Sequence, residues 1–245
     1  MRAAPPLLQV LASVATILLI FAALNVAYHV IRKPTEMFFP VAGALNKLSA
    51  ETWRQYGPLF RANATAAITP ELLAALAQVE AAGNPVARTY WRWRFSWNPF
   101  AIYQPASSAV GMYQMTDGAF AEARRYCIHD HRVVEDGPWH DWRSCWFNAL
   151  YTRIVPSHAV ELTAVSLDRN VADILQRRGL AAATPQQTQD LAALIHLCGA
   201  GAAGAFARRG FRLAPSQRCG DHEAAAYLAQ VNAMKRLFAR LAAAE

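Results

Sequence analysis

Glu80 is the acidic residue whose surroundings could serve catalysis in this 245-residue chain. It lies in the last turn of an apolar helical pattern that ends at Gly83. The carboxyl end of a helix carries partial negative charge, which favours a protonated carboxyl group over a carboxylate. A carboxyl group that can hold a proton is what general acid catalysis needs. A solvent-facing glutamate at a fraying helix end is the competing interpretation, and position alone favours it.

Gln114 is a second polar group in apolar surroundings, within the stretch GMYQMTDGAF at residues 111–120. A buried amide without hydrogen-bond partners costs roughly a few kcal/mol. Gln114 therefore needs a ligand, a water molecule or a backbone group. We expect it to line a binding groove; a structural glutamine that holds the local backbone is the alternative.

Three segments taken in order resemble the lytic transglycosylase family, whose members cleave bacterial peptidoglycan with a lysozyme-like domain. They are Glu80 followed by Gly83-Asn84-Pro85, then SSAVGMYQMTDGAF, and much later IHLCGAGAAGAF. The resemblance covers about residues 68–240. It implies that Glu80 is the catalytic residue and that the glycan is bound by five further residues: Asn84, Met112, Tyr113, Gln114 and His196.

The chain departs from the family pattern at three places. Ala81 stands where the family usually has serine, and Tyr113 replaces methionine before the glutamine. His196-Leu197-Cys198-Gly199 stands where the family has Tyr-Asn-Ala-Gly. The family tyrosine lies close to the catalytic glutamate, so His196 is the candidate for that contact.

The resemblance implies cleavage of the β-1,4 bond between N-acetylmuramic acid and N-acetylglucosamine. Glu80 would protonate the leaving oxygen and then take the proton of the muramic C6 hydroxyl, which closes a 1,6-anhydro ring. Hydrolytic lysozymes of the retaining type use two carboxyl groups, yet residues 81–116 contain neither aspartate nor glutamate. A hydrolytic lysozyme and a catalytically silent peptidoglycan-binding module are the alternative functions.

Other motifs give little reason to expect a metal or an organic cofactor. His129-Asp130-His131 and His140-Asp141 lie in a polar loop without a zinc-binding frame. The glycine-rich GAGAAGAF follows a helical pattern, whereas a dinucleotide-binding loop follows a strand. We therefore expect a cofactor-independent protein.

An aromatic-rich insertion, TYWRWRFSWNPF, separates the first two motifs. Its aromatic rings could stack on sugars while its arginines meet peptide carboxylates. Alternatively, the rings could pack a long loop onto the domain. The sequence leaves both interpretations open.

An apolar stretch from Leu7 to Ile31 lacks Asp, Glu, Lys and Arg and is long enough to cross a membrane. A cleaved signal peptide is the alternative, but no small-x-small cleavage site precedes Arg32. We expect an uncleaved single-pass anchor in an inner membrane with the catalytic domain in the periplasm. The flanking charges alone do not give the orientation of this anchor, because positive residues stand at both ends: Arg2 before it, and Arg32 and Lys33 after it.

The four cysteines form no CxxC pair. We predict two local disulfides, Cys127–Cys145 and Cys198–Cys219, as suits an oxidising periplasm; four buried free thiols are the alternative. The formal net charge is +7, but the arginines are scattered. We therefore do not expect nucleic acid as a partner. The resemblance and the anchor imply peptidoglycan strands, the membrane and envelope-assembly proteins as partners.

The hydrophobic pattern predicts a mainly α fold behind an N-terminal transmembrane helix, and the resemblance implies that the helical domain is lysozyme-like. We divide the chain into an anchor or signal segment (1–34), a helical connector (35–67) and the lysozyme-like domain (68–245). Helices are expected at 69–82, after Thr116, at 141–154, at 157–179, at 184–199 and from near Asp221. Loops are expected at 84–110 and 127–141.

Overall fold

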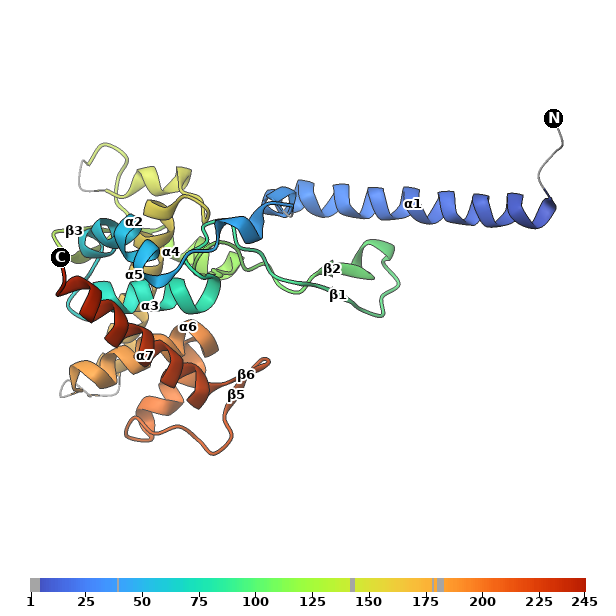
Figure 1. Ribbon diagram of the computed structural model, residues 1–245. Coiled ribbons are helices and arrows are strands. Elements are labelled where there is room, and N and C mark those ends of the chain that lie inside the picture. Colours follow the sequence, from blue (N-terminus) through green and yellow to red (C-terminus); the bar gives the residue numbers. More distant parts are fainter. Residues whose placement is uncertain (1–4, 39, 142–143, 178, 180–182) are drawn as a thin grey trace.

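The computed structural model describes residues 5–38, 40–141, 144–177, 179 and 183–245 (Figure 1). Its described part contains seven α-helices and three two-stranded antiparallel hairpins. The prediction of a mainly helical chain with an N-terminal apolar helix is confirmed.

Helix α1 (Pro6–Arg32) extends away from the body of the protein as a long rod (Figure 1). Two helices, α1 and α6 (Pro185–Arg208), are long and apolar enough to cross a membrane. Half of the most apolar window of α6 is buried in the domain, whereas none of the corresponding window of α1 is buried. Helix α1 therefore has the properties of a membrane span or of a signal sequence, and α6 those of a core helix.

Five helices enclose the main hydrophobic core: α2 (Ser49–Ala62), α3 (Pro70–Ala81), α5 (Pro156–Arg177), α6 and α7 (Ala224–Ala242). Helix α2 lies in the expected connector, yet it supplies Trp53, Tyr56 and Phe60 to this core. The 4-3-4-3 spacing of the apolar residues in α7 predicts a stripe that faces the core, and all five pack there: Tyr227, Val231, Met234, Phe238 and Leu241.

Threonine side chains cap the start of three helices. The side chain of Thr69 accepts a hydrogen bond from the backbone N–H of Leu72 at 3.3 Å. Thr116 caps α4 (Asp117–Ala123) in the same way, and Thr184 forms a capping box with Gln187 at the start of α6. These bonds satisfy N–H groups that have no partner inside the helix.

The helix expected at 141–154 is wrong. Within its described part, this segment forms only a 3₁₀ turn, η4 (Trp146–Leu150). Cys145 is bonded to Cys127, and the Asn148 side chain donates to the Tyr126 carbonyl at 2.5 Å. These contacts hold the segment against a neighbouring strand and override its helical periodicity.

The expected loops contain short hairpins that the sequence pattern did not reveal. Strand β1 (Trp91–Trp93) pairs with β2 (Tyr103–Pro105), around the short turn η3 (Pro99–Ala101), and β3 (Tyr126–His129) pairs with β4 (Arg132–Glu135). The turn between β3 and β4 has positive φ at both Asp130 (49°) and His131 (61°), as a two-residue hairpin turn of type I′ requires. The usual Asn-Gly or Asp-Gly signal is absent there. The third pair is β5 (Arg218–Cys219) with β6 (His222–Glu223).

Both predicted disulfides are confirmed. Cys127–Cys145 ties β3 to the start of η4, with 5.5 Å between the Cα atoms. Cys198–Cys219 ties α6 to β5, with 5.2 Å between the Cα atoms.

Candidate active site

Helix α3 ends in a sharp reversal directly after Glu80. Ala82 (φ 49°) and Gly83 (φ 64°) are both left-handed, and the N–H of Gly83 donates to the Ala77 carbonyl at 3.0 Å. A Cβ atom at position 83 would lie 2.3 Å from Oγ1 of Thr52 in α2. Only glycine fits this close approach, so the reversal fixes where Glu80 lies relative to α2.

Glu80 is held by side chains from two other helices. The Tyr227 hydroxyl of α7 donates to Oε1 of Glu80 at 2.5 Å. Nε2 of His196 in α6 lies 3.5 Å from the same oxygen. The side chains of Glu80 and His196 are 18% and 12% exposed. We call Glu80, His196 and Tyr227 the Glu80 cluster.

Tyr227 is buried, and its ring belongs to the predicted core stripe of α7. Burial raises the pKa of the Tyr227 hydroxyl, and the charge and hydrogen bond of Glu80 raise it further. The phenol therefore remains protonated and acts as a donor. Sequence reasoning missed this role, although a buried tyrosine hydroxyl in an otherwise apolar stripe usually needs a partner.

His196 lies in the last turn before α6 breaks. Gly199 has non-helical angles (φ 77°, ψ 166°), and the helix resumes beyond it. The predicted helix end at Gly199 is thus a break inside a longer helix. The disulfide of Cys198 anchors the backbone at this break, two residues from His196.

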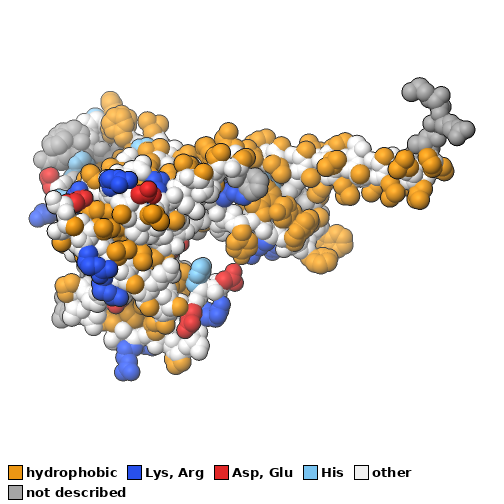
Figure 2. All heavy atoms as spheres, in the orientation of Figure 1, with side chains coloured by type: hydrophobic (Ala, Val, Ile, Leu, Met, Phe, Trp, Pro, Cys, Tyr) orange, Lys and Arg blue, Asp and Glu red, His pale blue; other side chains and the backbone are white. Residues whose placement is uncertain are grey.

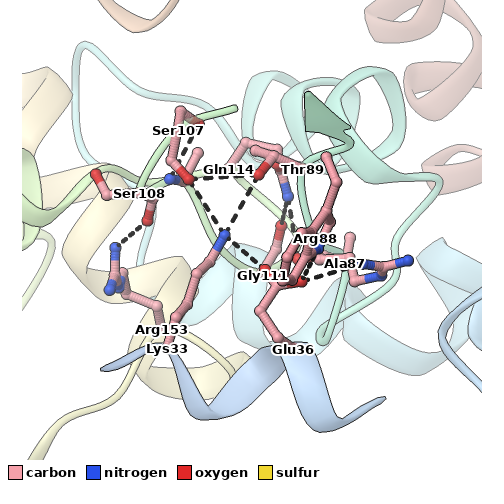
Figure 3. A network of polar contacts seen from close by, with 12 residues as sticks. Lys33, Glu36, Ala87, Arg88, Thr89, Ser107, Ser108, Gly111, Gln114 and Arg153 are labelled. Carbon is pink, nitrogen blue, oxygen red and sulfur yellow. Dashed lines mark hydrogen bonds and ion pairs between the residues drawn. The ribbon is translucent and has the colours of Figure 1, made fainter. Parts of the chain in front are cut away.

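Gln114 holds backbone in this structure. Its Nε2 atom donates to the carbonyls of Gly111 (2.9 Å) and Ala87 (3.2 Å), as Figure 3 shows. Its own φ is 45°, which places it inside a tight turn. These contacts correspond to the structural alternative; a groove-lining role for Gln114 stays a prediction.

Three other expected ligand-binding residues are buried. Met112 and Tyr113 are 0% and 1% exposed and belong to the main core, because the turn at Gly111 directs this apolar pair inward. Asn84 is 2% exposed, and its side chain donates to Asn46 at 2.9 Å and accepts from the Val86 N–H at 3.0 Å. All three side chains are enclosed by the protein in this structure, and a glycan-binding role for them stays a prediction.

Cys127, His129 and Cys145 bring potential metal ligands within 4.8 Å of one another. Both cysteines are in a disulfide, however, and a metal requires the thiolate form. The ring of His131 donates from Nδ1 to the Ala64 carbonyl at 2.9 Å. This cluster therefore offers a metal a single histidine.

The Glu80 cluster is suited to proton transfer. One carboxyl oxygen is fixed by Tyr227, while Oε2 makes no hydrogen bond to any residue that the structure describes. A fixed carboxyl group with one unoccupied oxygen can donate a proton and later accept one.

The chain matches no protein-family model, no curated protein and no solved structure.

Proposed function

We propose that this protein is a peptidoglycan lytic transglycosylase in which Glu80 is the general acid and base. The observation that carries the proposal is the Glu80 cluster: a partly exposed carboxyl group at the expected motif position, held at Oε1 by Tyr227. The function rests on this geometry together with the order of the sequence motifs.

In the proposed reaction, Glu80 donates its proton to the glycosidic oxygen as the bond to the muramic anomeric carbon breaks. The N-acetyl oxygen of the same sugar attacks that carbon and stabilises the positive charge. The carboxylate of Glu80 then removes the proton of the C6 hydroxyl, whose oxygen closes the 1,6-anhydro ring and displaces the N-acetyl oxygen. Because Tyr227 occupies Oε1, the proton moves through Oε2.

Participation of the substrate is favoured because the observed contacts to Glu80 come from a tyrosine and a histidine. Asp117, the first acidic residue after Glu80, is 70% exposed and pairs with Arg153 at 2.7 Å. It opens α4, where a carboxylate interacts favourably with the helix dipole. A retaining hydrolase would instead need a second carboxyl group about 5 Å from the first.

The proposed location is an inner membrane, with α1 as a retained single-pass anchor and the domain in the periplasm. Two observations support it. The polar side chains Asn25 and His29 of α1 are buried against the domain, where they donate to backbone carbonyls. Both disulfides suit an oxidising compartment. The proposed partners are peptidoglycan strands, the membrane and envelope-assembly proteins.

The test is digestion of purified peptidoglycan by the full chain and by a Glu80→Gln variant, followed by mass spectrometry. We expect 1,6-anhydromuropeptides from the parent and a loss of roughly 10²- to 10⁴-fold in rate in the variant, because an amide cannot donate the proton. Products with a reducing-end muramic acid would instead assign a hydrolytic lysozyme. Binding without cleavage by the folded parent would assign a silent binding module.

A further inference from the structure

The β1–β2 hairpin and its loop, residues 90–105, lie beside the carboxyl-terminal part of α1 (Figure 1). We call this segment the aromatic hairpin. Its Phe100 ring stacks on Tyr28 of α1, with 4.6 Å between ring centroids, and lies 6.4 Å from the Phe21 ring. The aromatic hairpin is therefore packed against the apolar rod.

Hydrogen bonds fix this packing. Asn25 of α1 donates to the carbonyl of Tyr103 at 2.8 Å, and His29 donates from Nε2 to the carbonyl of Phe100 at 2.8 Å. The His29 ring also meets the edge of the Trp91 ring. The two polar side chains of α1 thus satisfy backbone groups of the aromatic hairpin, and the two elements form one unit.

The tip of the aromatic hairpin leaves large apolar rings exposed. Trp93 is 75% exposed, and both Phe95 and Trp97 are fully exposed. They line an open hollow of about 740 Å³ together with Arg94, Ser96 and Ile102. A contiguous exposed apolar surface of this kind marks an interaction site. It also leaves the packed-loop interpretation of the insertion incomplete, since most of the surface of these three rings is exposed.

The apolar surface of α1 beside the aromatic hairpin indicates that the partner of the hairpin tip is a lipid bilayer. Hydrophobic side chains cover α1 along its length and gather again on the adjacent aromatic hairpin (Figure 2). Tyr28, on which the Phe100 ring stacks, precedes Arg32 by four residues, so Phe100 lies about 6 Å along α1 from its charged end. If α1 crosses a bilayer, as the proposed function holds, the same lipid surface must meet the tip.

The length of α1 and the unpaired backbone groups of the aromatic hairpin indicate how deep the hairpin lies in the bilayer. Residues 6–24 of α1 span about 28 Å, close to the thickness of the hydrocarbon core. The polar end of α1, from Asn25 to Arg32, then lies at the interface together with the aromatic hairpin. A two-stranded hairpin has unpaired edges that hydrocarbon cannot satisfy. Tryptophan and tyrosine prefer the interface, and the exposed Arg92 and Arg94 can reach lipid phosphates.

We propose that the aromatic hairpin is a second membrane-binding element. It inserts Trp93, Phe95 and Trp97 into the headgroup region of the bilayer that α1 crosses, and it holds the domain at a fixed height and orientation. This role extends the proposed function, since it depends on α1 as an anchor and on no property of the Glu80 cluster.

The test places a spin label at position 95 by a Phe95→Cys substitution in the full chain. The chain is reconstituted in vesicles of phosphatidylethanolamine and phosphatidylglycerol. A Trp139→Cys variant, labelled in the same way, is the matched control, because Trp139 is also an exposed aromatic residue but lies outside the aromatic hairpin (80% exposed). Neither substitution removes a buried side chain, and the native cysteines remain paired.

We expect the label at position 95 to collide more often with oxygen than with a water-soluble nickel complex, and the label at position 139 to show the reverse preference. A water-like label at position 95, or lipid contact at both positions, would overturn the proposal. Dipolar broadening between labels at position 95 would assign the tip to a second copy of the chain instead. Because no peptidoglycan is used, failure here leaves the transglycosylase proposal to its own test.

Discussion

The hydroxyl of Tyr227 donates to Oε1 of Glu80 across 2.5 Å, and this bond joins α7 to the end of α3. The two residues are 147 positions apart in the sequence. The helix whose apolar stripe builds the core therefore also supplies the donor that orients the candidate catalytic group. Packing and chemistry are coupled here, because any shift of α7 in the core moves the Tyr227 hydroxyl.

Removal of this hydroxyl should slow cleavage more than it harms folding. We expect Tyr227→Phe to lower the rate of peptidoglycan cleavage by roughly 10- to 100-fold, since a hydrogen bond to a charged group contributes roughly 1.5–3 kcal/mol. Tyr56→Phe is the matched control, because Tyr56 is buried in the same core. Steady-state cleavage assays of both variants test this prediction. Equal rates for both variants would mean that Tyr227 has no role in the cleavage reaction.

For Tyr113 we expect the opposite of the Tyr227 result: removal of the hydroxyl should change stability and leave the cleavage rate unchanged. Its hydroxyl is buried and has no hydrogen-bond partner among the described residues, and burial raises its pKa well above the ordinary value. Tyr113→Phe should keep full activity and raise the unfolding free energy by up to about 1 kcal/mol, because it removes an unsatisfied polar group. Chemical denaturation measures the stability. A large loss of cleavage with unchanged stability would return Tyr113 to the glycan-binding groove.

Tyr113 and Tyr227 indicate which features of the fold and the site can be predicted from the sequence and which cannot. Local signals were sufficient for the capped helices, for the α7 stripe, for both cysteine pairs and for the position of Glu80 at a helix end. Long-range packing decided the rest. Whether Tyr113 faces a groove or the core, and whether Tyr227 reaches Glu80, depends on how distant helices meet. The short hairpins have too few residues for a readable pattern. The helical pattern at 141–154 was readable, but the disulfide of Cys145 and the Asn148 hydrogen bond overrode it.

A buried charge cluster should make stability depend on pH. Glu36 accepts a hydrogen bond from Trp91 at 2.7 Å and pairs with Arg88 and Lys33, both at 3.0 Å; Figure 3 shows the two ion pairs at the base of α1. Burial alone would raise the pKa of Glu36, but the hydrogen bonds from Trp91, Lys33 and Arg88 and the charge of Lys33 outweigh it. The pKa therefore lies below the ordinary 4.5.

A lowered pKa means that the ionised form stabilises the fold. This contribution is complete above the ordinary pKa of 4.5 and is lost as the pH falls through the lower folded value. Glu36→Gln should cost roughly 3 kcal/mol near neutral pH, because it removes the buried carboxylate that pairs with Lys33 and Arg88. It should also flatten the acid limb of the stability curve. Glu135→Gln, which breaks an exposed pair with Arg125, is the control and should change little.

The last prediction separates the two disulfides by function. Each closes a loop of similar length, so replacing either pair by serine should cost about 3 kcal/mol by the chain-entropy estimate. Only Cys198–Cys219 anchors the break at Gly199, next to His196 and the Glu80 cluster. Cys127–Cys145 instead holds β3 against η4.

We therefore expect the Cys198→Ser/Cys219→Ser variant to lose cleavage activity at temperatures where it is still folded. The Cys127→Ser/Cys145→Ser variant, compared at equal folded fraction by circular dichroism, should retain its activity. Equal activities of the two folded variants would mean that the break in α6 does not position His196 for the reaction.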